Sequence, residues 1–294
     1  MSFKTSNVLK VYAIAVITTA IAFTSHAQTW ESTSTAKQKA AKQISQKQSA
    51  IKSWRDHLQK WGLDSNYNHA LAVGGKLNTD GWSGFAYYQK RDNNTSCHFF
   101  QLSFSEIKHE KQVKQQKGNT AFPELGAASP YVFGKINNLY TLQLGYGKEY
   151  LLLPGLLEGN MSVSLRVQAG ASMAMLKPYY LKLIYVNYDS AGQHATMQEE
   201  KYSEQNKEKF LNTSFILGAS NWTKSLSEIT YVPGAFADLG IAIEPLKNKN
   251  FIKTITIGGN FAFYSKELAI MAENKAYPWQ ANFYVGLSMG KRWK

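Results

Sequence analysis

The sequence predicts an all-β protein: a transmembrane antiparallel β-barrel of about ten strands, within a range of eight to twelve, preceded by a helical segment. Three patterns carry this prediction. Apolar residues fall at every second position in many runs of the chain, which is the period of a β-strand. The residues between them are mostly Gly, Ser, Thr, Gln and Asn, and the connections sort into short and long ones.

The first residues have the three parts of a secretory signal peptide. Lys4 and Lys10 precede an apolar run from Val11 to Thr24, and small residues precede a cleavage point after Ala27. This apolar run is shorter than the roughly 20 residues that a membrane-spanning helix needs. We therefore predict that residues 1–27 are a signal peptide and that the protein is exported.

Composition and charge narrow the classes of partner. The formal net charge is +13, which in a cytoplasmic protein would suggest nucleic acid, but export argues against that partner. In the cell envelope the expected partners are outer-membrane lipids and lipopolysaccharide, together with other envelope proteins. Cys97 is the only cysteine, so neither an N-terminal lipid anchor on cysteine nor an internal disulfide is expected.

Residues 28–64 form a second predicted region, a basic amphipathic helical segment on the periplasmic side. Between Ala36 and Trp61 the chain has seven Lys or Arg residues against one Asp. One narrow apolar stripe would lie on this helix, formed by Ile44, Ile51, Trp54, Leu58 and Trp61. Two interpretations stay open: the stripe packs on its own domain, or it docks a partner or a membrane surface.

Residues 65–294 are predicted to form the barrel. The candidate strands are 68–77, 82–90, 97–107, 131–136, 140–147, 162–173, 178–188, 234–245, 252–265 and 279–292. Their inner residues are small and polar, whereas a soluble β-sandwich, the alternative fold, would place its apolar side inside. The last strand ends at Trp293, which we predict to be an anchor at the periplasmic membrane interface, with Lys291 and Arg292 beside lipid head groups.

Loop lengths support a barrel with both termini on the periplasmic side. With ten strands, the connections 78–81, 108–130, 149–159, 189–233 and 266–278 would lie outside the cell. The connections 91–96, 137, 174–177 and 246–251 would lie inside. Most of the outer connections are longer than every inner one, as in outer-membrane barrels.

Charged residues with inward parity predict an ion-pair network in the lumen. These residues are Lys76, Arg166, Lys182, Asp238 and Glu244. In a narrow barrel the interior is nearly filled by side chains, so paired charges are favoured over the selectivity filter of a narrow channel.

The long connection at 189–233 is expected to be functional, because loops beyond about 15 residues usually are. Its first half is charged and compatible with a helix. Its second half carries apolar residues, including Phe215, Trp222 and Leu226, which must be covered. Either they form a lid over the barrel mouth or they bind a partner protein.

The sequence contains no catalytic, cofactor or metal motif, and we predict that the protein is not an enzyme. The alternative is a rim enzyme acting on lipids or peptides. His109-Glu110 in one outer loop, with His194 and Asp189 or Glu199 in another, would be its acid/base candidates. No spacing distinguishes a nucleophile with its base, so we expect exposed loop histidines instead.

Several segments also resemble a family. "YVFGKINNLYTLQLGYG" (131–147), "LKPYYLKLIYV" (176–186), "KYSEQNKEKFL" (201–211), "ITYVPGAFADLGIAI" (229–243) and "GLSMGKRW" (286–293) together resemble a mostly uncharacterised outer-membrane β-barrel family of the Bacteroidota. The resemblance implies location in the outer membrane, and membership of the multi-subunit envelope machines in which such bacteria use accessory barrels. We therefore predict a non-enzymatic accessory or structural subunit of a secretion or outer-membrane assembly complex.

Overall fold

The computed structural model describes residues 67–93, 95–116, 125–157, 161–189, 192–245 and 251–294. All of them belong to one compact unit, His57–Lys294. The predicted signal peptide (1–27) and the predicted helical segment (28–64), with Ile44, Ile51, Trp54, Leu58 and Trp61, lie outside the described residues and remain predictions.

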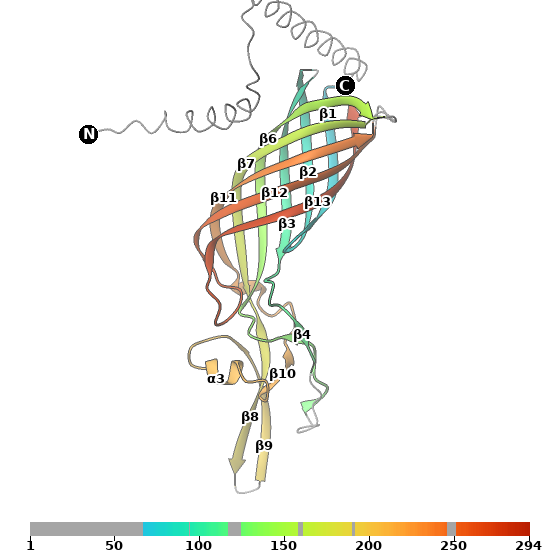
Figure 1. Cartoon of the computed structure of the whole chain (residues 1–294). Coiled ribbons are helices and arrows are strands. Elements are labelled where there is room, and N and C mark those ends of the chain that lie inside the picture. The colour runs from blue at the N-terminus through green and yellow to red at the C-terminus, as the bar shows by residue number, and fades with distance from the viewer. Residues whose placement is uncertain (1–66, 94, 117–124, 158–160, 190–191, 246–250) are drawn as a thin grey trace, which may run out of the picture. The chain divides into compact units, whose positions relative to one another are not determined.

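Eight strands of the described chain close into an antiparallel barrel (Figure 1). In chain order they are β1 (His69–Asn78), β2 (Gly81–Asn93), β3 (Ser96–Ile107), β6 (Asn137–Leu157), β7 (Met161–Pro178), β11 (Thr230–Pro245), β12 (Phe251–Leu268) and β13 (Tyr277–Trp293). The first and last strands close the ring, with His69 paired to Trp293 and Asn78 paired to Tyr284.

The predicted alternation decides which side of each strand faces the lumen. On β13, Phe283, Val285 and Leu287 are exposed, while Tyr284 and Ser288 between them are buried. The same parity holds around the wall, so apolar side chains point outward and most polar ones point inward. A barrel of about eight strands has an interior just wide enough for side chains to fill it.

Two segments that we predicted as barrel strands do not belong to the barrel, and this reduces the strand number from ten to eight. Residues 131–136 contain only β5 (Tyr131–Val132), which pairs with β4 (Lys114–Gln115) away from the barrel. Residues 178–188 become β8 (Tyr180–Asp189), the central strand of a separate sheet. The error has a physical cause, because alternation marks any strand with one buried face, whether it packs in a membrane wall or in a soluble sheet.

The corrected strand number also changes the connections. The described residues of the connections 79–80, 108–136, 179–229 and 269–276 lie at one end of the barrel, which we call the loop end. His69, Trp293 and the strand ends that border the connections β2–β3, β6–β7 and β11–β12 lie at the other, the terminal end. The predicted outer loop 149–159 is wrong, because β6 continues to Leu157 with two register shifts against β7. The predicted inner turn at 174–177 lies within β7, and residue 137 begins β6.

The long connection after β7 folds into structure of its own. It contains β8, β9 (Gly192–Lys201) and β10 (Ile216–Ala219), which form a three-stranded antiparallel sheet in the order β10-β8-β9. Of the charged stretch expected to be compatible with a helix, residues 198–210, only Lys207–Phe210 forms a helix, α3, and residues 198–201 belong to β9. A short 3₁₀ turn, η2 (Leu226–Glu228), precedes β11.

Candidate functional site

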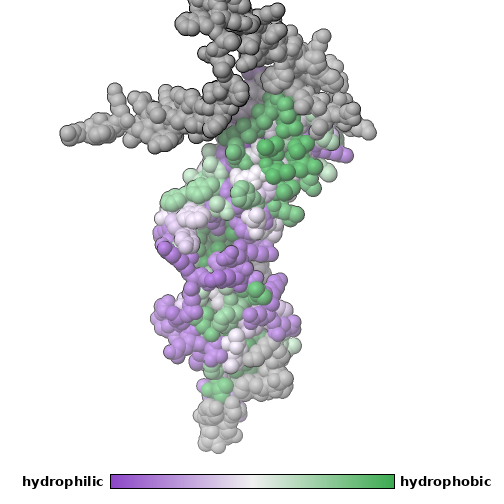
Figure 2. Space-filling view, viewed as in Figure 1, coloured by the Kyte–Doolittle hydropathy of each residue, from purple (hydrophilic) through white to green (hydrophobic). Residues whose placement is uncertain are grey.

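The outer wall of the barrel is a belt of exposed apolar side chains. On β1, β3 and β13 it includes Leu77, Phe100, Leu102, Phe283 and Leu287, all about half exposed or more. Figure 2 shows apolar residues gathered over the barrel and hydrophilic residues towards its loop end. So much exposed apolar surface is unfavourable in water, and it matches the lipid-facing band of a membrane barrel.

Aromatic side chains border this belt at both ends. At the loop end, the ring of Trp82 lies 6.3 Å from that of Phe104, and Phe104 stacks on Tyr140 at 5.8 Å. At the terminal end, Trp293 lies 6.1 Å from His69 and 6.3 Å from Tyr88. Trp293, the predicted interface anchor, is thus outward-facing and 41% exposed. Paired aromatic girdles of this kind mark the two membrane–water interfaces of outer-membrane barrels.

None of the helices among the described residues is long and apolar enough to cross a membrane. The protein is located in the bacterial outer membrane, which suits a closed eight-stranded barrel with an apolar belt, two aromatic girdles and long loops at one end. Long loops face the cell exterior in such barrels, so the loop end is extracellular and the terminal end is periplasmic.

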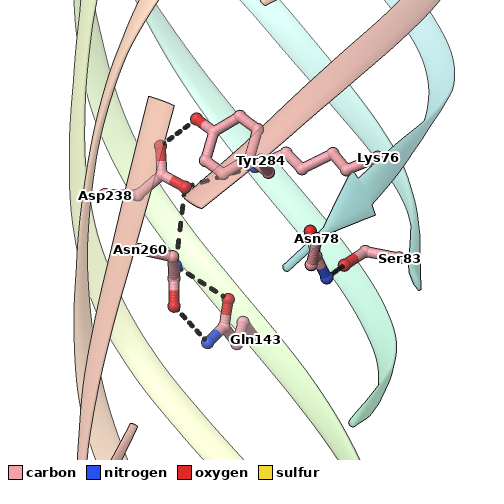
Figure 3. A network of polar contacts seen from close by, with 7 residues as sticks. All are labelled: Lys76, Asn78, Ser83, Gln143, Asp238, Asn260 and Tyr284. Carbon is pink, nitrogen blue, oxygen red and sulfur yellow. Dashed lines mark hydrogen bonds and ion pairs between the residues drawn. The ribbon is translucent and has the colours of Figure 1, made fainter. Parts of the chain in front are cut away.

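The centre of the lumen holds one compact polar cluster around Asp238 (Figure 3). The Lys76 Nζ lies 3.2 Å from Asp238 Oδ2, and both side chains are buried. The Tyr284 hydroxyl donates to Asp238 Oδ1 at 2.7 Å, and Asn260 Nδ2 donates to Oδ2 at 3.4 Å. Lys76 also lies over the Tyr284 ring, 3.8 Å from its centroid. Every charge in this cluster therefore has an opposite charge or a hydrogen-bond partner.

Below this cluster, towards the periplasm, lie two further ion pairs. The Arg166 Nε lies 3.7 Å from Glu149 Oε2, and its guanidinium carbon lies 4.3 Å from the Phe99 ring centroid. The Arg292 Nη2 donates to Glu244 Oε2 at 2.6 Å. The expectation that Arg292 meets lipid head groups is wrong, because its even position on β13 turns it into the lumen.

Lys182, the fifth predicted lumen residue, lies elsewhere. It belongs to β8, outside the barrel, opposite Glu199 of β9. The prediction placed it in the lumen because residues 178–188 alternate as a wall strand does. Lys76, Asp238, Arg166 and Glu244 line the lumen, but in separate pairs rather than in one network.

Aromatic rings complete the lumen, and lumen-facing glycines make room for them. A Cβ atom placed on Gly258 would lie 2.6 Å from the Tyr284 hydroxyl, and one on Gly145 would lie 2.7 Å from the Phe236 ring. The glycines of the inner face are recognisable in the sequence, but the rings that fill their space were not predicted. The inward parity of Phe85, Tyr87 and Phe99 was the available signal.

An apolar cluster closes the extracellular end of the lumen. It brings Leu139, Phe236 and Tyr264 of the barrel together with Val132 and Met271 from the loops. Between this cluster and Asp238 lies a polar cavity. The volume open to the centre of a water molecule in it is about 20 Å³. That is room for water but not for a larger solute.

The extracellular sheet has a hydrophobic core of its own. Leu181, Leu183, Phe210 and Ile216 are buried there together with Tyr131 from the preceding loop. Two connections of the barrel thus pack on each other at the loop end. Lys135 lies beside them, 6% exposed, with its Nζ donating to Gln112 Oε1 at 3.1 Å.

Burial lowers the pKa of the Lys135 amine to about 8, against the opposing effect of Glu106. The nearby ammonium groups of Lys108, Lys114 and Lys177 lower this pKa further. Lys135 is therefore a buried amine that loses its charge in mildly basic solution. Nothing in the sequence pattern singled it out, since its burial comes from the packing of two loops that are distant in sequence.

The three predicted partner-binding residues of the long connection lie in different surroundings. Phe215 is half-buried beside β8, where its carbonyl accepts a hydrogen bond from Ile184 N at 2.8 Å. Trp222 is 56% exposed and Leu226 is 44% exposed. Trp222 lies at the barrel, because its indole N–H donates to the Tyr140 hydroxyl at 3.1 Å.

The candidates for rim chemistry are not assembled into a site. His109 lies in the loop after β3, where its Nδ1 accepts from Lys111 N at 3.2 Å. His194 of β9 pairs with Asn187 of β8, and Asn187 lies seven residues beyond Tyr180, where β8 begins. Glu199 is ion-paired with Lys224. Among the described residues no cluster of three or more His, Cys, Asp or Glu side chains could hold a metal ion.

Comparisons with known proteins return outer-membrane barrels at low similarity. The N-terminal β-barrel domain of Pseudomonas aeruginosa OprF is 12% identical, with 77% of this chain and 98% of that chain covered and a TM-score of 0.30. Ail, the attachment invasion locus protein of Yersinia pestis, is 9% identical, with 77% of this chain and 99% of that chain covered and a TM-score of 0.33. A major outer membrane protein from Thermus thermophilus is 8% identical, with 76% of this chain and 99% of that chain covered and a TM-score of 0.38. The chain matches no protein-family model and no curated protein sequence.

Proposed function

We propose that the chain is a non-enzymatic, non-conducting outer-membrane barrel that serves as an accessory, structural subunit of a multiprotein envelope complex. The barrel would act as an anchor, and the extracellular sheet would bind the partner. The predicted periplasmic segment, residues 28–64, would provide a second contact, and an origin in the Bacteroidota remains part of this proposal. Secretion and outer-membrane assembly complexes are the expected classes of assembly.

The free edge of β9 is the observation that carries this proposal. Among the described strands, β9 pairs only with β8, so its other edge presents backbone N–H and C=O groups. Such an edge is a template for an extended segment of another protein. The side chains of Thr196, Met197 and Gln198 on this strand are exposed. The sheet has its own hydrophobic core, so the edge is held in place without a partner.

The filled lumen supports the anchoring part of the proposal. Ion pairs, aromatic rings and the apolar cluster occupy successive levels between the periplasmic and extracellular ends. A barrel filled in this way offers no transport path, which leaves its loops and its terminal segment to interact with other molecules. No observation favours the channel or the rim enzyme over this function.

The test is affinity purification of the tagged full chain from its native outer membrane in mild detergent, followed by mass spectrometry. Proline is placed at Ala195 in one variant and at Thr196 in another. Successive N–H groups along a strand alternate in direction, so one variant blocks the free edge and the other removes a hydrogen bond to β8.

We expect stoichiometric envelope partners for the unmodified chain. Of the two proline variants, the one that keeps the extracellular sheet should lose the partner held by β9. Deletion of residues 29–61 should release a periplasmic partner and leave the barrel folded, as judged by heat-modifiable migration on a gel. An unmodified chain that purifies alone would contradict the proposal.

A further inference from the structure

The segment between the extracellular sheet and β11, residues 220–229, lies against the outside of the barrel. Its 3₁₀ turn η2 contacts β7, and the Lys177 ammonium near the end of β7 donates to the Trp222 carbonyl. The Lys177 Nζ also lies 4.0 Å from the centroid of the Trp222 indole ring. These contacts hold the Trp222 backbone and ring at the loop end of the wall, rather than above the lumen.

Trp222 extends a row of outward-facing aromatic residues that runs across three barrel strands. Trp82 of β2, Phe104 of β3 and Tyr140 of β6 are successive neighbours in this row. The Tyr140 hydroxyl then accepts a hydrogen bond from the Trp222 indole at 3.1 Å. Trp and Tyr concentrate where a membrane meets water, because their rings are apolar and their N–H or O–H groups need a polar partner.

The polar contacts of the same segment join it to the sheet. Lys201 of β9 pairs with Glu228 at 2.7 Å, and Lys224 pairs with Glu199. The Tyr180 hydroxyl donates to Glu228 at 2.8 Å. Trp222 and Leu226 keep about half of their surface uncovered in spite of all these contacts. The segment therefore has polar links to the extracellular sheet, and about half of the surface of its two large apolar side chains is left uncovered within the described chain.

We infer that residues 220–229 form a foot that rests on the outer leaflet of the membrane, with Trp222 and Leu226 inserted at the boundary between lipid head groups and acyl chains. The continuity of Trp222 with the barrel girdle favours lipid over a protein as the occupant. The foot would fix the extracellular sheet relative to the membrane plane. Phe215 does not take part, because it lies beside β8 instead.

Fluorescence quenching in vesicles tests this inference on the purified full chain, refolded without any partner. Trp222→Phe is compared with the unmodified chain, so that the difference spectrum reports Trp222 alone. Trp82→Phe is the matched control, since Trp82 lies in the same aromatic row on the barrel wall. Phosphatidylcholine brominated near the carbonyl end of its acyl chains quenches from the lipid, and iodide quenches from the water.

We expect brominated lipid to quench the Trp222 component about as much as the Trp82 component, and iodide to quench both weakly. Quenching of the Trp222 component by iodide but not by brominated lipid would overturn the inference and return Trp222 to the candidates for protein binding. Because no partner is present, this result is independent of whether β9 binds an envelope protein. Loss of heat-modifiable migration would show a folding defect, in which case Trp222→Tyr, which keeps a polar aromatic ring, replaces the first variant.

Discussion

Asp238 is the residue on which the central lumen cluster depends, because Lys76, Tyr284 and Asn260 all donate to its carboxylate. Asp238→Ala would leave the Lys76 ammonium buried without a counter-charge. We expect this change to lower the free energy of unfolding by about 3–5 kcal/mol, the range for breaking a buried ion pair. Urea unfolding in vesicles, followed by tryptophan fluorescence, measures the loss.

The double variant Lys76→Met with Asp238→Leu is the control for this prediction. It removes both charges and fills their space with apolar side chains, so it should lose less stability than Asp238→Ala alone. A double variant that loses the sum of the two single losses would mean that the charges act independently.

Gly258 allows a second prediction at the residue scale. An added Cβ would meet the Tyr284 hydroxyl at 2.6 Å and the Leu239 carbonyl oxygen at 2.5 Å. Gly258→Ala should therefore displace Tyr284 from Asp238 and lower the free energy of unfolding by about 1–3 kcal/mol, as overpacking does. Gly84→Ala is the matched control, because a Cβ there meets nothing within 4 Å. Equal unfolding midpoints for the two variants would contradict the prediction.

Parity alone could predict much of the lumen, residue by residue. It gave Lys76, Arg166, Asp238 and Glu244 inward directions, and the structure places all four there. Parity also gives Arg292 an inward direction, but its charge led us to expect it beside lipid head groups. The partner of Arg166 could not be found in this way, because Glu149 was assigned to the predicted loop 149–159. Which charges meet depends on the stagger of strands around the ring, and single-strand patterns do not contain that information.

At the scale of elements, the foot and the sheet are joined by ion pairs that respond to pH. A hydrogen bond from Lys201 lowers the pKa of Glu228, and one from Lys224 lowers the pKa of Glu199, both below the ordinary 4.5. A carboxyl group with a lowered pKa contributes stability above its unfolded pKa, and this contribution is lost as pH falls through the folded value. The pairs are largely exposed, so each contributes below about 1 kcal/mol and is screened by salt.

We therefore expect amide protection in residues 220–229 to decrease when the pH is lowered from 6 to 3, while protection in β12 stays constant. Hydrogen exchange with mass spectrometry, corrected for the intrinsic rate at each pH, measures the change. The variant with Lys201→Met and Lys224→Met should show low protection at both pH values. A pH response that survives in this variant would assign the effect to other groups.

Elements were predicted unevenly, and the reason is physical. The long strands with polar inner faces were recognisable because a membrane wall constrains both faces of a strand. The error at β8 arose because Leu181 and Leu183 alternate as wall residues do, yet they face the core of the extracellular sheet. Pro154 and Gly155 broke the alternation of β6 in sequence, and they lie in a register shift between Leu153 and Leu157, after which pairing with β7 resumes.

For the whole molecule, the lumen is blocked at several levels in series. Arg166 with Glu149 lies towards the periplasm, Lys76 with Asp238 lies at the centre, and Phe236 with Tyr264 belongs to the apolar cluster at the loop end. Barriers in series have a simple consequence, since removal of one leaves the others in place. The cavity between the central and the extracellular levels has room for water but not for a larger solute.

Planar-bilayer recording of the refolded full chain should accordingly show no stepwise conductance, and Arg166→Ala should show none either. Arg166→Ala combined with Lys76→Ala, Asp238→Ala, Phe236→Ala and Tyr264→Ala removes side-chain bulk at all three levels, and small steps are expected from this variant if the barrel still folds. Heat-modifiable migration on a gel verifies that each variant is folded. Steps from the unmodified chain would show an open channel, and steps from Arg166→Ala alone would show that the periplasmic pair is its gate. Either result would replace the anchoring role proposed for the barrel by transport.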